Sequence, residues 1–142
     1  MIRRWKDMST EKVECMKGGK GEVELINILE MDEMYNMGRF FGVTVIPPGC
    51  SGGCHTHTGD FETYFILEGK AVINDNGTEY ELGPGDMMQC RDGSSHGIRN
   101  DGDCDLKYLA VILYSPSGES SADKTDEDEP ASAGKTAEKG LE

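Results

Sequence analysis

The sequence predicts an all-β fold, a β-sandwich or small barrel such as the jelly roll, for residues 22–114. This part of the chain is a series of short runs rich in Val, Ile, Phe and Tyr, the residue types that favour strands. Glycine, proline, asparagine and aspartate separate the runs at short intervals, which is typical of antiparallel strands joined by tight turns. Only the short segment 31–37 has the spacing of a helical turn.

Seven strands are expected along this domain. They are Glu22–Leu29, Arg39–Ile46, Phe61–Leu67, Ala71–Asn74, Thr78–Leu82, Met87–Cys90 and Leu106–Tyr114. Between the first two strands, Met31, Met34 and Met37 recur three residues apart, and we expect them to pack in the core or under a lid. Asn76 and Gly77 separate two strands and tolerate the positive φ that a type I′ hairpin requires.

Two polar segments flank the predicted domain. Residues 1–21 are expected to form an N-terminal arm that packs late or exchanges with a partner chain. Residues 115–142 contain no aromatic residue, valine or isoleucine, and they carry the acidic run Asp126–Glu129. Such a composition buries too little apolar surface to offset the entropy of ordering, so we expect a disordered, solvated acidic tail.

Charge and cysteine content restrict the partners. The chain has 27 Asp and Glu against 14 Lys and Arg, a net charge of −13 that repels nucleic-acid phosphates and anionic membranes. No apolar run is long enough for a membrane span or a secretory signal, so a cytoplasmic protein is expected. Five cysteines, an odd number, are then expected to stay reduced without a structural disulfide.

The three histidines, His55, His57 and His96, all lie in the predicted β domain. On a strand, two residues separated by one share a face, so the imidazoles of His55 and His57 are expected to point the same way. Glu62 follows after a turn and can return beside them on the next strand, on the same face as Tyr64. A half-buried carboxylate at that position needs a cation or strong hydrogen-bond donors.

Two imidazoles and a carboxylate are a ligand set that suits Fe(II), Mn, Ni or Zn with coordination positions left open. The alternative is that the histidines are ordinary hydrogen-bonded strand residues beside a surface carboxylate. A third interpretation is a zinc site built on Cys50-(x3)-Cys54-His55-x-His57, with Cys90 and Cys104 as its only possible completing ligands. Strand alternation opposes it, because Cys54 should point away from the face that holds its neighbour His55.

Two motifs in this region resemble those of the cupin superfamily. The first is Gly49-(x5)-His55-x-His57-(x4)-Glu62-(x6)-Gly69. The second is Gly77-(x5)-Gly83-Pro84-Gly85-Asp86, continuing to His96-(x3)-Asn100. In the second motif glycine stands at position 83, where the family has proline, a change that affects a turn and leaves the ligands untouched. The resemblance covers residues 40–114.

The resemblance implies a jelly-roll barrel of six to eight strands that holds one divalent transition metal, iron, manganese, nickel or zinc. The implied metal ligands are His55, His57, Glu62 and His96. It also agrees with an expected homodimer, formed by exchange of the arm or by packing of a sheet face. Tyr64 is the candidate catalytic residue, with a hydroxyl that could donate to a substrate oxygen or simply satisfy a core hydrogen bond.

The expected function is that of a small metal-dependent enzyme with a metal-chelating oxygenated substrate, a hydroxy- or oxo-acid or a carbohydrate derivative. Dioxygenase, decarboxylase, lyase and isomerase chemistry are not separated by the sequence. The alternative is a non-catalytic metal-containing module that binds a small molecule or sugar. Arg39 could face inward and hold a substrate carboxylate, whereas Arg99 is expected to face outward.

Overall fold

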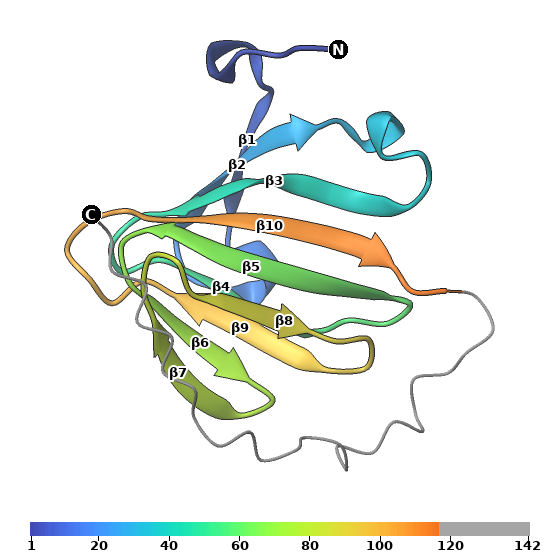
Figure 1. The fold of residues 1–142 in the computed structure, drawn as a ribbon. Coiled ribbons are helices and arrows are strands. Elements are labelled where there is room, and N and C mark those ends of the chain that lie inside the picture. Colours follow the sequence, from blue (N-terminus) through green and yellow to red (C-terminus); the bar gives the residue numbers. More distant parts are fainter. Residues whose placement is uncertain (117–142) are drawn as a thin grey trace, which may run out of the picture.

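The computed structural model describes residues 1–116, which form two antiparallel β-sheets packed face to face (Figure 1). The strands are β1 (Thr10–Glu14), β2 (Glu22–Leu29), β3 (Gly38–Ile46), β4 (Ser51–Thr56), β5 (Asp60–Glu68), β6 (Ala71–Asp75), β7 (Thr78–Leu82), β8 (Met87–Cys90), β9 (Ser95–Arg99) and β10 (Leu106–Tyr114). One sheet has the order β1-β2-β3-β10-β5-β8 and the other the order β4-β9-β6-β7. The predicted all-β sandwich is confirmed. The prediction of a disordered acidic tail concerns residues that lie almost entirely in 117–142, outside the part that the structure describes.

All seven predicted strands are present, and three more, β1, β4 and β9, were not predicted. The sequences of β4 and β9 contain glycine, serine and histidine instead of the Val, Ile and aromatic residues that mark strands. These two strands form because they pair with each other and because β6 pairs with β9. The described residues therefore contain ten strands, more than the six to eight that the resemblance implied.

The main core lies between the two sheets, where alternate residues of each strand meet. On β5 the side chains of Glu62, Tyr64 and Ile66 point inward and are buried, while the residues between them face outward. Burial of one large apolar side chain stabilises a fold by about 1.5–3 kcal/mol, so this cluster holds the sheets together. Its buried members are Val23, Ile46, Tyr64, Ile66, Ala71, Ile73, Met88, Cys90, Ile98, Leu106, Tyr108 and Ala110.

The connections between strands follow local sequence rules. Asn76 (φ 48°) and Gly77 (φ 93°) both have positive φ between β6 and β7, as the type I′ hairpin prediction requires. The short 3₁₀ helix η3 (Met31–Met34) occupies the segment where a helical turn was expected. Met34 is buried, but Met31 and Met37 are exposed, so the expected core role holds for only one of the three methionines.

The N-terminal arm packs on its own chain in this structure. It contains the 3₁₀ helices η1 (Trp5–Asp7) and η2 (Met16–Gly18) on either side of β1. β1 pairs along its whole length with β2, and η2 contacts β4. At the start of the arm, Arg3 forms an ion pair with Glu33 at 2.6 Å. Residues 1–116 contain no helix with the length and apolar character needed to cross a bilayer.

Candidate metal centre

Four side chains converge between the two sheets. His55 on β4 and His96 on β9 are opposite each other in the smaller sheet, and Glu62 comes from β5 of the larger sheet. His57 lies just beyond the end of β4, so the prediction that it lies on a strand is wrong. Backbone hydrogen bonds with Gly93 and Ser94 hold it there, and its imidazole still points to the others. The ligand atoms of the four residues lie within 4.8 Å of one another.

The distances between these atoms match those expected around one ion. Glu62 Oε2 lies 3.0 Å from Nε2 of both His57 and His96, and 3.9 Å from Nε2 of His55. His57 Nε2 is 3.1 Å from His96 Nε2 and 3.2 Å from His55 Nε2. Two donors about 2.1 Å from a common ion and at right angles lie about 3.0 Å apart. The cluster is therefore spaced to hold a single metal ion.

The second nitrogen of each imidazole shows which way the rings are protonated. His55 Nδ1 lies 2.9 Å from the carbonyl oxygen of Gly53, and His57 Nδ1 lies 2.7 Å from Asp60 Oδ1. His96 Nδ1 lies 3.4 Å from the thioether sulfur of Met88. All three partners accept hydrogen bonds, so each Nδ1 can keep its proton when a metal is bound, and each Nε2 would then present a lone pair. Three such lone pairs and the carboxylate of Glu62, all facing one another, fit a cation.

The charge of the cluster rests on Glu62. Burial alone would raise the pKa of Glu62, but hydrogen bonds from the three imidazoles outweigh burial and hold that pKa well below its usual range. The hydrogen bond to Glu62 raises the pKa of His57, burial opposes this, and Asp60 adds to the increase. The site therefore keeps an ionised, buried carboxylate among its imidazoles.

Asp60 connects the cluster to an arginine. Its Oδ2 accepts a hydrogen bond from Arg39 Nε at 2.7 Å, while its other oxygen accepts one from His57. Burial favours a higher pKa for Asp60, but Arg39 and His57 lower it overall, so the carboxylate is ionised. This residue was not predicted from the sequence. Its position three residues after His57, at the start of β5, was the available signal.

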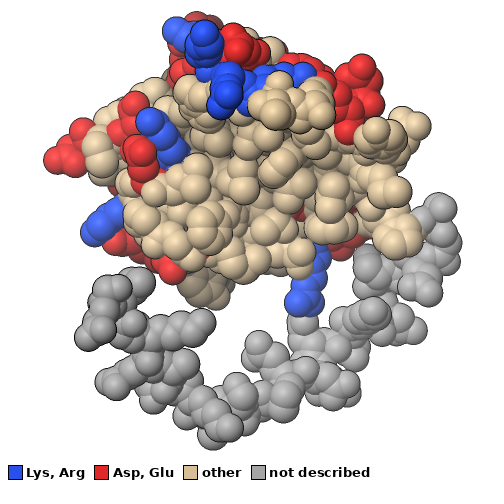
Figure 2. Space-filling view, turned by 45° about the horizontal axis from the view of Figure 1, so that its top comes forward, with Lys and Arg blue, Asp and Glu red and all other residues tan. Residues whose placement is uncertain are grey.

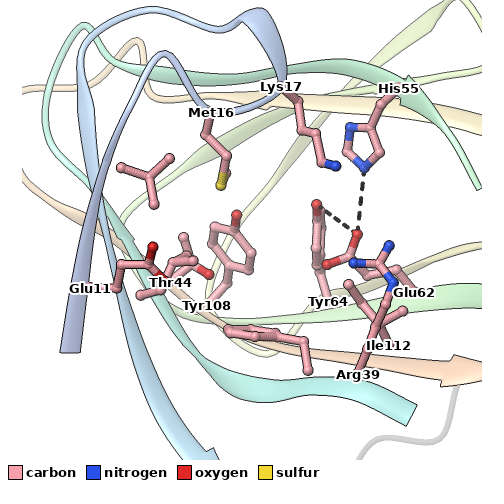
Figure 3. A pocket seen from close by; sticks show the side chains of 13 residues that line it. Glu11, Met16, Lys17, Arg39, Thr44, His55, Glu62, Tyr64, Tyr108 and Ile112 are labelled. Carbon is pink, nitrogen blue, oxygen red and sulfur yellow. Dashed lines mark hydrogen bonds and ion pairs between the residues drawn. The ribbon is translucent and has the colours of Figure 1, made fainter. Parts of the chain in front are cut away.

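A cavity of about 270 Å³ opens beside the cluster, and His55 and Glu62 are the two members that line it (Figure 3). The hydroxyl of Tyr64 lies 3.3 Å from Glu62 Oε2 and 3.5 Å from His96 Nε2. Burial raises the pKa of Tyr64 well above its ordinary value, so the hydroxyl is neutral and acts as a donor. Tyr64 therefore lies where a catalytic or ligand-binding hydroxyl was expected, and its catalytic role stays a prediction.

The cavity wall also carries charged side chains from three other elements. Arg39 on β3 lines it, in agreement with the inward position considered for this residue, as do Lys17 on η2 and Glu11 on β1. The sequence offered no signal for Lys17 or Glu11, because both lie in the arm. Arg99 faces outward as predicted and forms ion pairs with Glu79 and Asp101.

The cysteines lie outside the cluster. Cys54 is exposed on the opposite face of β4 from His55, and neither it nor Cys50 belongs to the group of converging ligand atoms in residues 1–116. Cys90 is buried, and burial raises the pKa of its thiol to about 11, so it stays protonated. The geometry thus supports the histidine and glutamate cluster and gives no support to the cysteine-containing zinc site.

Comparison with known proteins identifies relatives of this chain. The cupin domain family matches residues 42–112. An oxalate-binding protein of Thermotoga maritima is 42% identical over 113 residues, which cover 80% of this chain and 93% of that protein. A crystal structure from the same organism, described as a predicted oxalate decarboxylase, superposes with a TM-score of 0.78 at 42% identity, over 81% of this chain and 100% of that one. A 5-nitrosalicylic acid 1,2-dioxygenase of Bradyrhizobium is 35% identical over 54% of this chain and 39% of the enzyme.

Proposed function

The chain belongs to the cupin family, and from this premise we propose that it binds a divalent transition metal and, on that metal, a small chelating carboxylic acid such as oxalate. The proposed metal ligands are His55, His57, Glu62 and His96. The observation that carries the proposal is the convergence of these four acceptor atoms on one point at the wall of a cavity. When bound, the ion supplies a Lewis acid to which the oxygens of the ligand can coordinate.

The cavity supports an acid of this size and charge. Its volume of about 270 Å³ lies just below the roughly 300–1,000 Å³ of pockets for drug-sized ligands. Beside the cluster it offers the neutral hydroxyl donor of Tyr64 and the cations of Arg39 and Lys17. Apolar side chains, among them Val13 and Phe40, form other parts of the wall. The name of the oxalate-binding relative points to the same class of ligand.

Binding without turnover is the interpretation that the geometry supports best. Acid–base catalysis works best with a group whose pKa lies near the working pH. The pKa of Tyr64 lies well above that range, so its hydroxyl is poorly suited to acid–base catalysis. Glu62 and His55 are occupied as proposed metal ligands. Catalysis is the second candidate, and the contact between the Tyr64 hydroxyl and Glu62 favours it, because that hydroxyl could donate to a substrate oxygen.

The binding proposal is tested with the full chain purified without added metal. Elemental analysis first identifies the resident ion. Calorimetric titration then measures oxalate binding to the metal-loaded protein and to the same protein after treatment with a chelator. We expect binding only in the metal-loaded form, and equal affinity in the two forms would refute a role for the metal. Cys54→Ser is the matched control and should bind oxalate as the wild type does.

A turnover assay separates the two candidate functions. Metal-loaded protein is incubated with a panel of hydroxy- and oxo-acids, oxalate included, under air and under argon, and products are measured. A binding module gives thermal shifts without product. Turnover that disappears in Tyr64→Phe, with metal content unchanged, would establish the enzyme and the role of this hydroxyl. Iron in the centre with oxygen-dependent turnover would indicate dioxygenase chemistry, and manganese or nickel would favour decarboxylation, lyase or isomerase chemistry.

A further inference from the structure

We propose that Lys17, carried by the N-terminal arm, makes the cavity selective for acids with two carboxylates over acids with one. The inference rests on the proposed function and specifies its ligand class. Lys17 extends from η2 into the cavity, and Figure 3 shows its ammonium group in the part of the cavity where the His55 imidazole lies. The arm thus contributes a cation to a cavity whose metal cluster lies between the two sheets.

The charge balance of the site requires this cation. A divalent ion held by Glu62 leaves one net positive charge at the centre. The guanidinium of Arg39 is already opposed by Asp60 at 2.7 Å. A dicarboxylate would therefore leave the centre with one excess negative charge, which is unfavourable at a partly buried site. A monocarboxylate would leave none, so a further cation matters only for the dianion.

Lys17 is available to supply that charge. Within residues 1–116 it forms no ion pair or hydrogen bond. The remaining charged group of the cavity wall, Glu11, lies at the far end in Figure 3, next to Thr44. With the proposed ion bound, the end of the cavity that holds the metal cluster would therefore be cationic, whereas Glu11 lies at the opposite end.

Backbone packing fixes Lys17 relative to the metal ligands. A Cβ atom at Gly53 would lie 2.1 Å from the carbonyl oxygen of Lys17, so only glycine lets η2 lie this close to β4. Gly19 packs in the same way, with a Cβ position 2.2 Å from the carbonyl oxygen of Ser51. The carbonyl oxygen of Gly53 also accepts the hydrogen bond from His55 Nδ1. One glycine thus positions both the turn that carries Lys17 and a proposed metal ligand.

The backbone conformation of Lys17 agrees with a functional position. The φ angle of Lys17 is 54° and that of Cys15 is 50°. Both lie in the left-handed region, which residues other than glycine, asparagine and aspartate seldom adopt. Such conformations persist only where the surrounding structure over-determines them, and they are concentrated at ligand sites. Here the contacts with β4 hold the turn in the conformation that directs Lys17 inward.

The test compares two acids of nearly equal size on the metal-loaded full chain. Oxalate is a dianion, and in oxamate an amide replaces one carboxylate. Calorimetric titration measures both affinities for the wild type, Lys17→Gln and the control Lys20→Gln, an exposed lysine of the same arm that does not line the cavity. We expect Lys17→Gln to weaken oxalate binding roughly tenfold, equivalent to about 1.4 kcal/mol, and oxamate binding less than twofold. Lys20→Gln should match the wild type for both acids.

The outcomes separate this inference from the proposed function. If the metal-loaded wild type binds neither acid, the proposed function fails, and the inference with it. If the wild type binds oxalate but Lys17→Gln changes neither affinity, or weakens both acids equally, only the selectivity role of Lys17 is refuted. Elemental analysis of Lys17→Gln must show wild-type metal content. A loss of metal would mean that Lys17 acts on the centre itself, which also overturns the proposal.

Discussion

Glu62 is the one carboxylate among the four converging side chains, so its substitution tests the centre by charge alone. Glu62→Gln keeps the shape of the side chain but leaves a divalent ion uncompensated in a buried site. We expect this change to lower metal affinity at least as much as His57→Ala or His96→Ala does. The measurement is metal stoichiometry and competition with a chelator. Cys54→Ser should retain the metal, and loss of metal there with retention in Glu62→Gln would favour the cysteine site.

The protonation of His57 predicts how metal content depends on pH. The hydrogen bond to Glu62 raises the pKa of His57 in the metal-free protein, so a proton is held there to a higher pH than in a free imidazole. Metal binding must displace this proton and keep the other imidazoles neutral. Metal occupancy is therefore full above the raised pKa and falls as the pH drops through it, steeply below about pH 6. Dialysis at a series of pH values followed by elemental analysis measures this, and full occupancy at about pH 4.5 would contradict it.

Asp60 is the next residue to test, because it contacts His57 and Arg39 but is not itself a proposed ligand. Asp60→Asn keeps the side-chain volume and removes the charge that orients the imidazole and opposes the guanidinium. Such partners of metal ligands are typically worth a factor of about 10–100 in affinity, and we expect at least a tenfold loss. Chelator competition measures it. Asp103→Asn, at an exposed aspartate, is the control and should leave the affinity unchanged.

At the scale of elements, the contact between η2 and β4 depends on glycine. In Gly53→Ala the new Cβ atom would meet the carbonyl oxygen of Lys17 at 2.1 Å and the backbone nitrogen of Gly19 at 2.9 Å, and backbone cannot rotate away as a side chain does. We expect a loss of about 2 kcal/mol in the free energy of unfolding, within the range for overpacked sites. Denaturant titration of the metal-free protein measures this loss. Gly83→Ala, where a Cβ meets nothing within 4 Å, should stay within about 0.5 kcal/mol of the wild type.

At the scale of the whole molecule, the outer face of the six-stranded sheet supports the expected homodimer. Phe65 and Leu67 on β5 and Met87 on β8 are 43%, 42% and 54% exposed. Phe65 and Met87 are paired neighbours on β5 and β8, and Figure 2 shows one face of the molecule where Lys, Arg, Asp and Glu lie mainly at the margins. Exposed apolar patches of this kind mark interaction surfaces. We predict a dimer at tens of micromolar in sedimentation velocity experiments, and a monomer at that concentration would refute it.

A pair of substitutions locates the dimer contact. Phe65→Lys places a charge on the outer face of β5 and should shift the protein towards the monomer, because an unpaired charge is costly in an apolar interface. Thr78→Lys, at an exposed threonine of β7 away from this patch, is the matched control and should leave the dimer intact. Equal sedimentation of both variants and the wild type would show that the contact lies elsewhere.

Features that depend only on neighbouring residues follow from the local sequence. Alternation on β5 placed Glu62 and Tyr64 on the inward face, because side chains on a strand alternate whatever lies beyond it. Asn76 and Gly77 determined their own hairpin, because the turn depends on the φ angles of two residues. The spacing of histidines and glutamate resembled a cupin motif, and the structure brings those four residues together.

Contacts between segments that are distant in the sequence arise only in the folded molecule. The glycine-containing strands β4 and β9 form through pairing with neighbours, since their own residues have weak strand preference. Arg39 and Asp60 meet because β3 and β5 both flank β10 in one sheet. Lys17 reaches the cavity because Gly53 allows the arm to pack on β4. Such contacts depend on how the sheets and the arm pack together, and no short window of the sequence contains that information.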